Sequence, residues 1–116
     1  MKVHLDFSVF IGDINSYTNY GQGSGEVSFS QVPRHNELII LHAPPPGPIF
    51  SAFALPALRV QTVFLFPNRK SDELNALCGL EDLYIPSRAA AVQLAQYLEK
   101  YLTIYLDEHL IDLAKE

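Results

Sequence analysis

The chain of 116 residues has one cysteine, Cys78, and no long apolar run. A single cysteine cannot form a disulfide within the chain, so the sequence gives no sign of an oxidising compartment. No stretch approaches the roughly 18 consecutive apolar residues that suggest a membrane span. Asp6 falls inside the N-terminal segment, where a signal peptide would need an apolar run. We therefore expect a cytoplasmic protein that does not enter a membrane.

Motifs for catalysis and cofactor binding are also missing. The sequence contains no Gly-x-Ser-x-Gly, His-Glu-x-x-His or Cys-x-x-Cys motif. Its histidines share no metal-ligand spacing, and the glycines at 21, 23 and 25 lack the Lys-Ser/Thr of a phosphate-binding loop. We expect no cofactor and no metal, and we favour a non-enzymatic role while leaving catalysis open.

Positive charge is scarce in the C-terminal part of the chain. Residues 71–116 carry nine acidic and three basic side chains, and the whole chain has a formal net charge of −5. This balance disfavours binding to nucleic acid. An acidic surface would suit a basic protein partner, although a charged helix face is commonly just solvated.

What is present predicts a sheet. Residues 2–11 alternate between polar and apolar, which is typical of a strand with one buried face, and Phe10 interrupts the polar side. Residues 26–30, 38–41 and 58–66 give three more strands, and residues 80–85 give a fifth. The glycine-rich residues 12–25 are expected to form a loop. A short helix is expected over residues 71–78, with Ser71 as its N-cap.

The last third of the chain predicts a long amphipathic helix. Ser87 is a good N-cap residue, and neither glycine nor proline interrupts residues 88–115. Twenty-eight helical residues would span about 42 Å, so the helix should either break near Asp107 or overhang the domain. A second apolar ridge recurs every seven residues at Tyr97, Ile104 and Ile111. We expect this ridge to pack on another copy of the chain; the alternative is a kinked helix folded over one core.

These elements predict one α+β domain over residues 1–116. It would contain a mostly antiparallel sheet of four or five strands, a short helix, and a long C-terminal helix packed across one face.

The leading functional hypothesis is a small non-catalytic protein-interaction module that forms a homodimer through its C-terminal helix. Tyr17 and Tyr20, on the expected loop, would contact a protein partner. The alternative is a small-molecule-binding protein or enzyme with an aromatic pocket between sheet and helix. That pocket would be lined by aromatic side chains and one histidine, namely His42, Phe50, Phe53, Phe64, Tyr84 and Tyr101.

Overall fold

The computed structural model describes residues 1–41, 57–67 and 73–108, and most of these residues lie in strands. The elements follow in chain order: β1 (Lys2–Asp13), β2 (Ser16–Ser28), β3 (Leu38–Ile40), β4 (Ala57–Leu65), β5 (Leu74–Leu80), β6 (Leu83–Ile85), α1 (Arg88–Leu102) and β7 (Ile104–Glu108). The predicted fold class was wrong, because the described chain is mostly β with a single helix.

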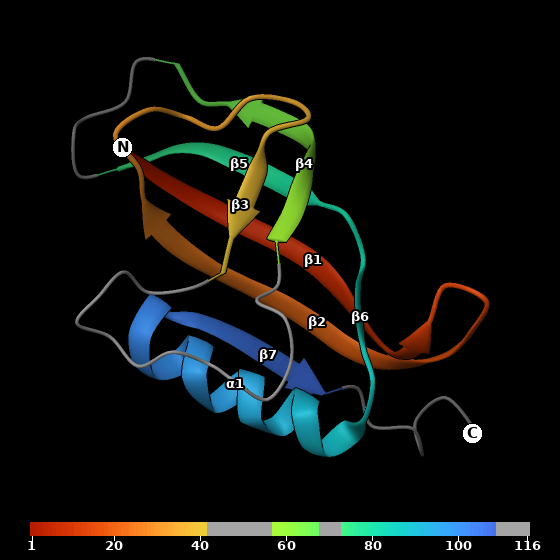
Figure 1. Cartoon of the computed structure of the whole chain (residues 1–116). Coiled ribbons are helices and arrows are strands. Elements are labelled where there is room, and N and C mark those ends of the chain that lie inside the picture. The colour runs from red at the N-terminus through yellow and green to blue at the C-terminus, as the bar shows by residue number, and fades with distance from the viewer. Residues whose placement is uncertain (42–56, 68–72, 109–116) are drawn as a thin grey trace, which may run out of the picture.

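The strands form one mixed sheet in the order β3-β4-β5-β1-β2-β7, and β6 pairs with β1 beyond the end of β5 (Figure 1). The pairs β1–β2, β2–β7, β4–β5 and β3–β4 are antiparallel. The pairs β1–β5 and β1–β6 are parallel. The N-terminal hairpin therefore lies in the middle of the sheet, with later parts of the chain on both sides of it.

Strand β1 confirms the prediction made from its alternating pattern. Val3, Leu5, Phe7 and Val9 are all buried, with exposed fractions of 2% or less. The hairpin closes where the Asp13 carboxylate accepts hydrogen bonds from the backbone N–H groups of Asn15 and Ser16. We call the side of the sheet with the buried residues the covered face, and the opposite side the open face.

The expected loop over residues 12–25 is instead most of strand β2. Gly21, Gly23 and Gly25 pair with buried residues of β1, so they lie on the covered face. A Cβ atom added to Gly23 would lie 2.2 Å from Cζ of Phe7. A Cβ on Gly25 would lie 2.4 Å from the backbone oxygen of Thr103. These glycines are needed for close approach of their neighbours rather than for a turn.

The expected short helix over residues 71–78 was also wrong, because residues 74–80 form β5 between β1 and β4. Ala76, Cys78 and Leu80 are buried at alternate positions. The sequence fits a helix as well, since Leu74, Leu77 and Cys78 follow helical spacing. Pairing with β1 on one side and β4 on the other makes this segment a strand, whereas its sequence alone does not decide between strand and helix.

The C-terminal helix begins as predicted and ends early. The Ser87 hydroxyl accepts a hydrogen bond of 3.1 Å from the N–H of Ala90. Helix α1 stops after 15 residues at Leu102, because Thr103 adopts a left-handed conformation with φ of 53°. Ile104 and Tyr105 then start β7, which pairs with β2. β-branched and aromatic residues favour a strand, and the glycine-rich edge of β2 supplies its partner.

The core lies between the covered face and α1, which runs along β7 (Figure 1). Ala91, Leu94 and Leu98 of the helix are at most 1% exposed. No polar or charged side chain is buried among the residues that the structure describes. The helix thus covers one face of the sheet near its β2–β7 side.

Candidate functional site on the open face of the sheet

The open face of the central hairpin is polar over most of its length. The β1 residues on this face pair with β2 residues on the same face: Lys2 with Ser28, His4 with Glu26, Asp6 with Ser24, and Ser8 with Gln22. In the middle of this strip the Gln22 side-chain amide donates a hydrogen bond of 2.6 Å to the Asp6 carboxylate. The strip has a hollow at one end and a group of aromatic rings at the other.

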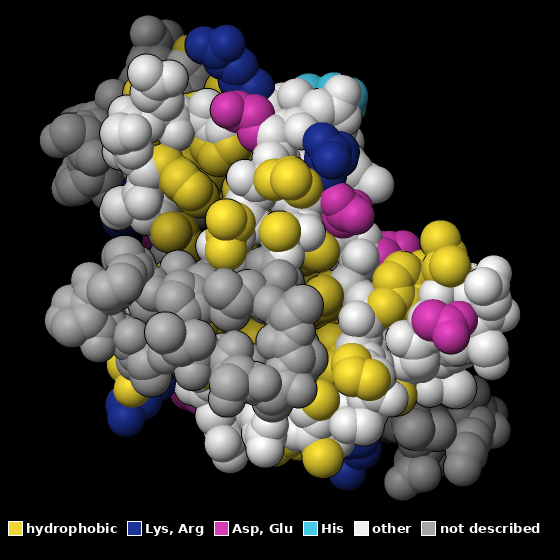
Figure 2. Space-filling view, in the orientation of Figure 1, with side chains coloured by type: hydrophobic (Ala, Val, Ile, Leu, Met, Phe, Trp, Pro, Cys, Tyr) yellow, Lys and Arg dark blue, Asp and Glu magenta, His cyan; other side chains and the backbone are white. Residues whose placement is uncertain are grey.

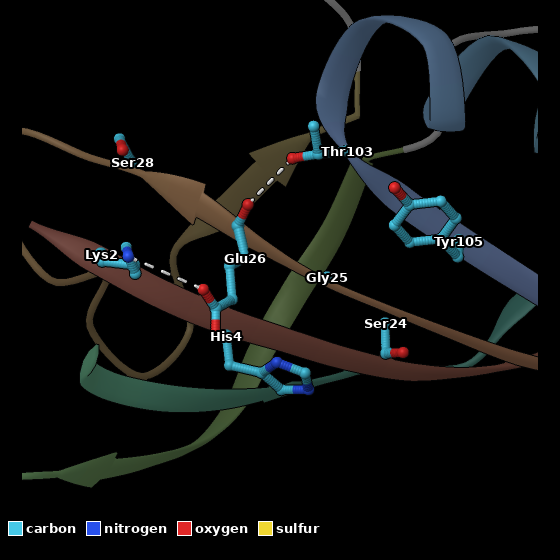
Figure 3. Close-up of a pocket in the computed structure, with 8 residues that line it drawn as sticks. All are labelled: Lys2, His4, Ser24, Gly25, Glu26, Ser28, Thr103 and Tyr105. Carbon is cyan, nitrogen blue, oxygen red and sulfur yellow. Dashed lines mark hydrogen bonds and ion pairs between the residues drawn. The ribbon is translucent and has the colours of Figure 1, made fainter. Parts of the chain in front are cut away.

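The hollow has a volume of about 520 Å³ and lies where β1, β2 and β7 run side by side (Figure 3). Most of the residues that line it carry a polar group: Lys2, His4, Ser24, Gly25, Glu26, Ser28, Thr103 and Tyr105. We call it the polar hollow. It presents an ammonium group, an imidazole, a carboxylate and several hydroxyl groups, which together suit a small polar ligand.

Glu26 lines the polar hollow and makes two contacts there, one through its carboxylate and one through its backbone oxygen. Lys2 Nζ lies 3.9 Å from the Glu26 carboxylate, and the side chains of this ion pair are 41% and 52% exposed. Water screens such a pair, so it adds little stability. The Thr103 hydroxyl donates a hydrogen bond of 3.0 Å to the backbone oxygen of Glu26. This bond fixes the junction between α1 and β7 to the end of β2.

At the other end of the strip the rings of Phe10, Tyr17 and Tyr84 form an aromatic cluster. The ring centroid of Phe10 lies 5.0 Å from that of Tyr17 and 5.4 Å from that of Tyr84, and the centroids of Tyr17 and Tyr84 are 5.4 Å apart. The parallel pairing of β6 with β1 sets Tyr84 beside Phe10. Burial is the largest cause that raises the pKa of Tyr84. The charge of Asp82 raises this pKa further, and Tyr17 adds a smaller increase. Tyr17 stays 50% exposed, so the cluster is a surface feature.

Tyr20 was expected on a loop with Tyr17, but it lies on the covered side and is only 6% exposed. Burial raises its pKa, and the charge of Glu108 adds to the effect while Arg88 opposes it. The Arg88 guanidinium donates hydrogen bonds of 2.9 and 2.6 Å to the Glu108 carboxylate. This pair joins the start of α1 to the end of β7.

The other predicted site residues are dispersed. Tyr97 is 7% exposed, and Ile104 is 1% exposed in β7 rather than on a helix. Tyr101 is 38% exposed, with its ring 5.1 Å from that of Tyr97. Neither Tyr84 nor Tyr101 lines the polar hollow, and Phe64 is 58% exposed on β4. His42, Phe50, Phe53 and Ile111 lie outside the described residues.

Sequence reasoning missed Phe10 and Tyr105 as surface residues of interest. The interruption of the polar side of β1 at Phe10 was the available signal for the aromatic cluster. Tyr105 falls within the segment expected to be helical, and it lies instead on the open face of the sheet because it pairs with Ser24. The polar hollow was not predictable, since it requires β7 to lie beside β2.

The sheet ends in two edge strands. β3 has three residues, and two of them, Leu38 and Ile40, are 54% and 60% exposed. β7 has five residues and pairs with β2 alone among the strands that the structure describes. Charged residues commonly protect a sheet edge from pairing, but in β7 they occupy only the last two positions, Asp107 and Glu108.

Within residues 1–41, 57–67 and 73–108, no three His, Cys, Asp or Glu side chains are grouped so that they could hold a metal ion. No helix in this part of the chain is both long enough and apolar enough to cross a membrane. No family model matches the chain, and no match was found among curated proteins or solved structures.

Proposed function

We propose that the protein is a small non-catalytic interaction module that self-associates through its C-terminal segment, with β7 as the contact between two copies. The observation that carries this proposal is the place of β7 at one end of the sheet, beside β2 alone among the described strands. The outer edge of such a strand presents N–H and C=O groups that can pair with another chain. We also place the protein in the cytoplasm, since its one cysteine is a free and buried thiol.

The charges of β7 favour an antiparallel pairing of the two copies. Asp107 lies near one end of the strand, and Glu108 beside it is paired with Arg88. A parallel pairing would bring the Asp107 carboxylates of both copies together, and like charges in opposing positions are destabilising. In an antiparallel pair centred on Leu106, Asp107 lies opposite Tyr105 of the other copy. The same surface then serves both copies, as a two-fold dimer requires.

Two exposed tyrosines flank the proposed contact. Tyr105 is 48% exposed on the open face, and Tyr101 is 38% exposed on α1, which covers the opposite face. Tyrosine is enriched in the buried centres of interfaces because it combines a large apolar surface with a hydroxyl group. Pairing along β7 would bring both rings next to the second copy.

The test is the mass of the protein by light scattering on a sizing column. Tyr97→Glu and Ile104→Glu are unsuitable variants, because both side chains are buried and a carboxylate there would unfold the protein. Tyr105→Glu is suitable, since it places a second negative charge opposite Asp107 of the other copy. Tyr17→Glu is the matched control, because Tyr17 is equally exposed at the far end of β2.

We expect twice the 13.0 kDa of one chain for the wild type and for Tyr17→Glu. Tyr105→Glu should elute as a single folded chain with an unchanged circular dichroism spectrum. A wild type that remains at 13.0 kDa over a wide concentration range contradicts the proposal, and so does a Tyr105→Glu variant that stays paired.

A second candidate function is small-molecule binding in the polar hollow, which its volume of about 520 Å³ and its mixed donors and acceptors favour. A bound ligand stabilises the native state by about 2.7 kcal/mol at a hundred times its dissociation constant. A thermal-shift screen of small polar metabolites would detect this. A hit that disappears in His4→Ala and persists in Tyr101→Glu, which changes a residue beside the proposed contact and outside the hollow, would separate ligand binding from self-association.

A further inference from the structure

The aromatic cluster is a surface for which self-association through β7 gives no use. Its three rings come from three different strands, and together they sit at the hairpin end of the open face. Tyr17 meets both neighbours at steep angles, with interplanar angles of 64° and 68°. Because Tyr17 is half exposed, the cluster offers aromatic surface to a group arriving from solvent.

The electrostatics of the cluster are negative. Aromatic ring faces carry the negative part of a quadrupole and attract cations. Asp82 lies two residues before Tyr84, immediately ahead of β6. The charge of Asp82 also acts on the Tyr84 hydroxyl, as the raised pKa of Tyr84 indicates. Acidic and hydrophobic side chains lie next to each other at this end of the molecule (Figure 2).

We propose that the aromatic cluster binds the cationic side chain of a basic peptide segment, with an arginine guanidinium stacked on Tyr17 and its charge offset by Asp82. A net charge of −5 attracts such a segment over a distance. The rings and the carboxylate then supply the short-range contacts. This surface is separate from β7, so the proposal stands or falls independently of self-association.

Charge also selects this occupant over the other partners that aromatic surfaces bind. Stacked rings bind single-stranded nucleic acid through its bases, but that binding depends on positive charge that tracks the phosphates. The excess of acidic residues in this chain opposes it. A second copy of the chain would carry the same negative charge to the same site. A basic peptide is the partner that both the rings and the charge favour.

Isothermal titration calorimetry with two synthetic peptides tests the proposal. One peptide alternates arginine and serine, and the other replaces each arginine by citrulline, which keeps the shape and removes the charge. Tyr17→Leu removes the ring, Tyr17→Phe keeps it, and Asp82→Asn removes the charge at constant shape. Tyr101→Leu is the control, because it changes a comparably exposed tyrosine on α1.

We expect saturable binding of the arginine peptide and none of the citrulline peptide. Tyr17→Leu should weaken binding roughly tenfold, in line with a partly desolvated cation–π contact, and Asp82→Asn should weaken it several-fold. Tyr17→Phe and Tyr101→Leu should bind like the wild type. Equal binding of the two peptides overturns the proposal. So does wild-type affinity in both Tyr17→Leu and Asp82→Asn, because the cation would then bind at another acidic surface. Absence of binding at millimolar peptide also overturns it.

Discussion

Gly23→Ala is expected to destabilise the protein, although alanine is ordinarily the better residue inside a strand. The new Cβ would lie 2.2 Å from Cζ and 2.3 Å from Cε2 of the Phe7 ring. Carbon atoms in contact prefer about 3.5–4.0 Å, so the ring or the strand has to move by more than an ångström. Phe7 is only 2% exposed, and the surrounding core leaves its ring little room.

The cost follows from overpacking. Extra carbon atoms in a filled core destabilise a protein by about 1–3 kcal/mol. Replacing glycine reduces the freedom of the unfolded chain, which offsets about 0.4–1 kcal/mol of this where no strain arises. We expect a net loss of about 1–2 kcal/mol in the free energy of unfolding. Urea denaturation followed by circular dichroism measures this loss, and an unchanged m-value would show that the same surface is exposed on unfolding.

A double-mutant cycle identifies the cause. Phe7→Leu shortens the side chain that the new Cβ would meet, so Gly23→Ala should cost less in that background, by about 0.5–2 kcal/mol. Ser24→Ala, the next residue on the opposite face, is the control and should change stability by less than about 0.5 kcal/mol. Additive effects in the cycle, or an unchanged stability for Gly23→Ala, would refute the packing argument.

Two further predictions concern the α1–β7 junction and the response to high pH. Thr103 holds a left-handed φ of 53°, which β-branched residues adopt at a cost. Thr103→Val keeps this strain and removes the hydroxyl bond to the Glu26 backbone oxygen, so it should lower the melting temperature. Thr103→Gly also loses that bond but relieves the strain, and it should stay within about 1 kcal/mol of the wild type; a more stable Thr103→Val would contradict this. Burial raises the pKa of the Cys78 thiol above its ordinary 9.0 and that of Tyr20 above its ordinary 10.0. Both groups therefore hold their protons more tightly in the folded state, and their contribution to stability is complete below pH 9 and is lost as the pH rises further. Urea titrations between pH 7 and 10.5 should show this decline, and in Cys78→Ala it should begin later; a decline that starts at the same pH in both would exclude the thiol as its source.

The elements that sequence reasoning found are those whose pattern is local. The alternation of residues 2–11 specifies β1, and Ser87 specifies the start of α1, because a period or a cap is complete within a few residues. The apolar runs near residues 38–41 and 58–66 likewise became β3 and β4. Each of these predictions depended on neighbours in sequence alone.

The errors arose where contacts between distant residues decide. Gly21, Gly23 and Gly25 suggest a flexible loop when only local freedom is considered, whereas Phe7 and the α1–β7 segment require the space that they leave. Thr103 belongs to an unbroken helical pattern, and its turn becomes favourable because the edge of β2 is there to receive β7. Helix propensity is a weak preference that such pairing overrides.

The candidate site could be predicted in part. Tyr17 and Tyr84 were both named, but for two different sites, because 66 intervening residues conceal that their rings are 5.4 Å apart. Their proximity follows from the parallel register of β6 on β1, in which Phe10 faces Tyr84. Sequence gave no indication of that register, and so the acidic and aromatic groups could not be combined into one surface.

The position of the N-terminal hairpin has a consequence for how the chain folds. β1 and β2 leave the ribosome before their neighbours β5, β6 and β7, and Gly23 pairs with Leu106, which is made 83 residues later. Pairing between strands so distant in sequence is slow, because a long loop must close before any contact compensates for it. Until β5 and β6 emerge, both edges of the hairpin are open; the β2 edge stays open, and the apolar side lacks the helix, until α1 and β7 follow. Folding during synthesis therefore cannot be completed strand by strand, and the nascent hairpin is the species that a chaperone would have to protect.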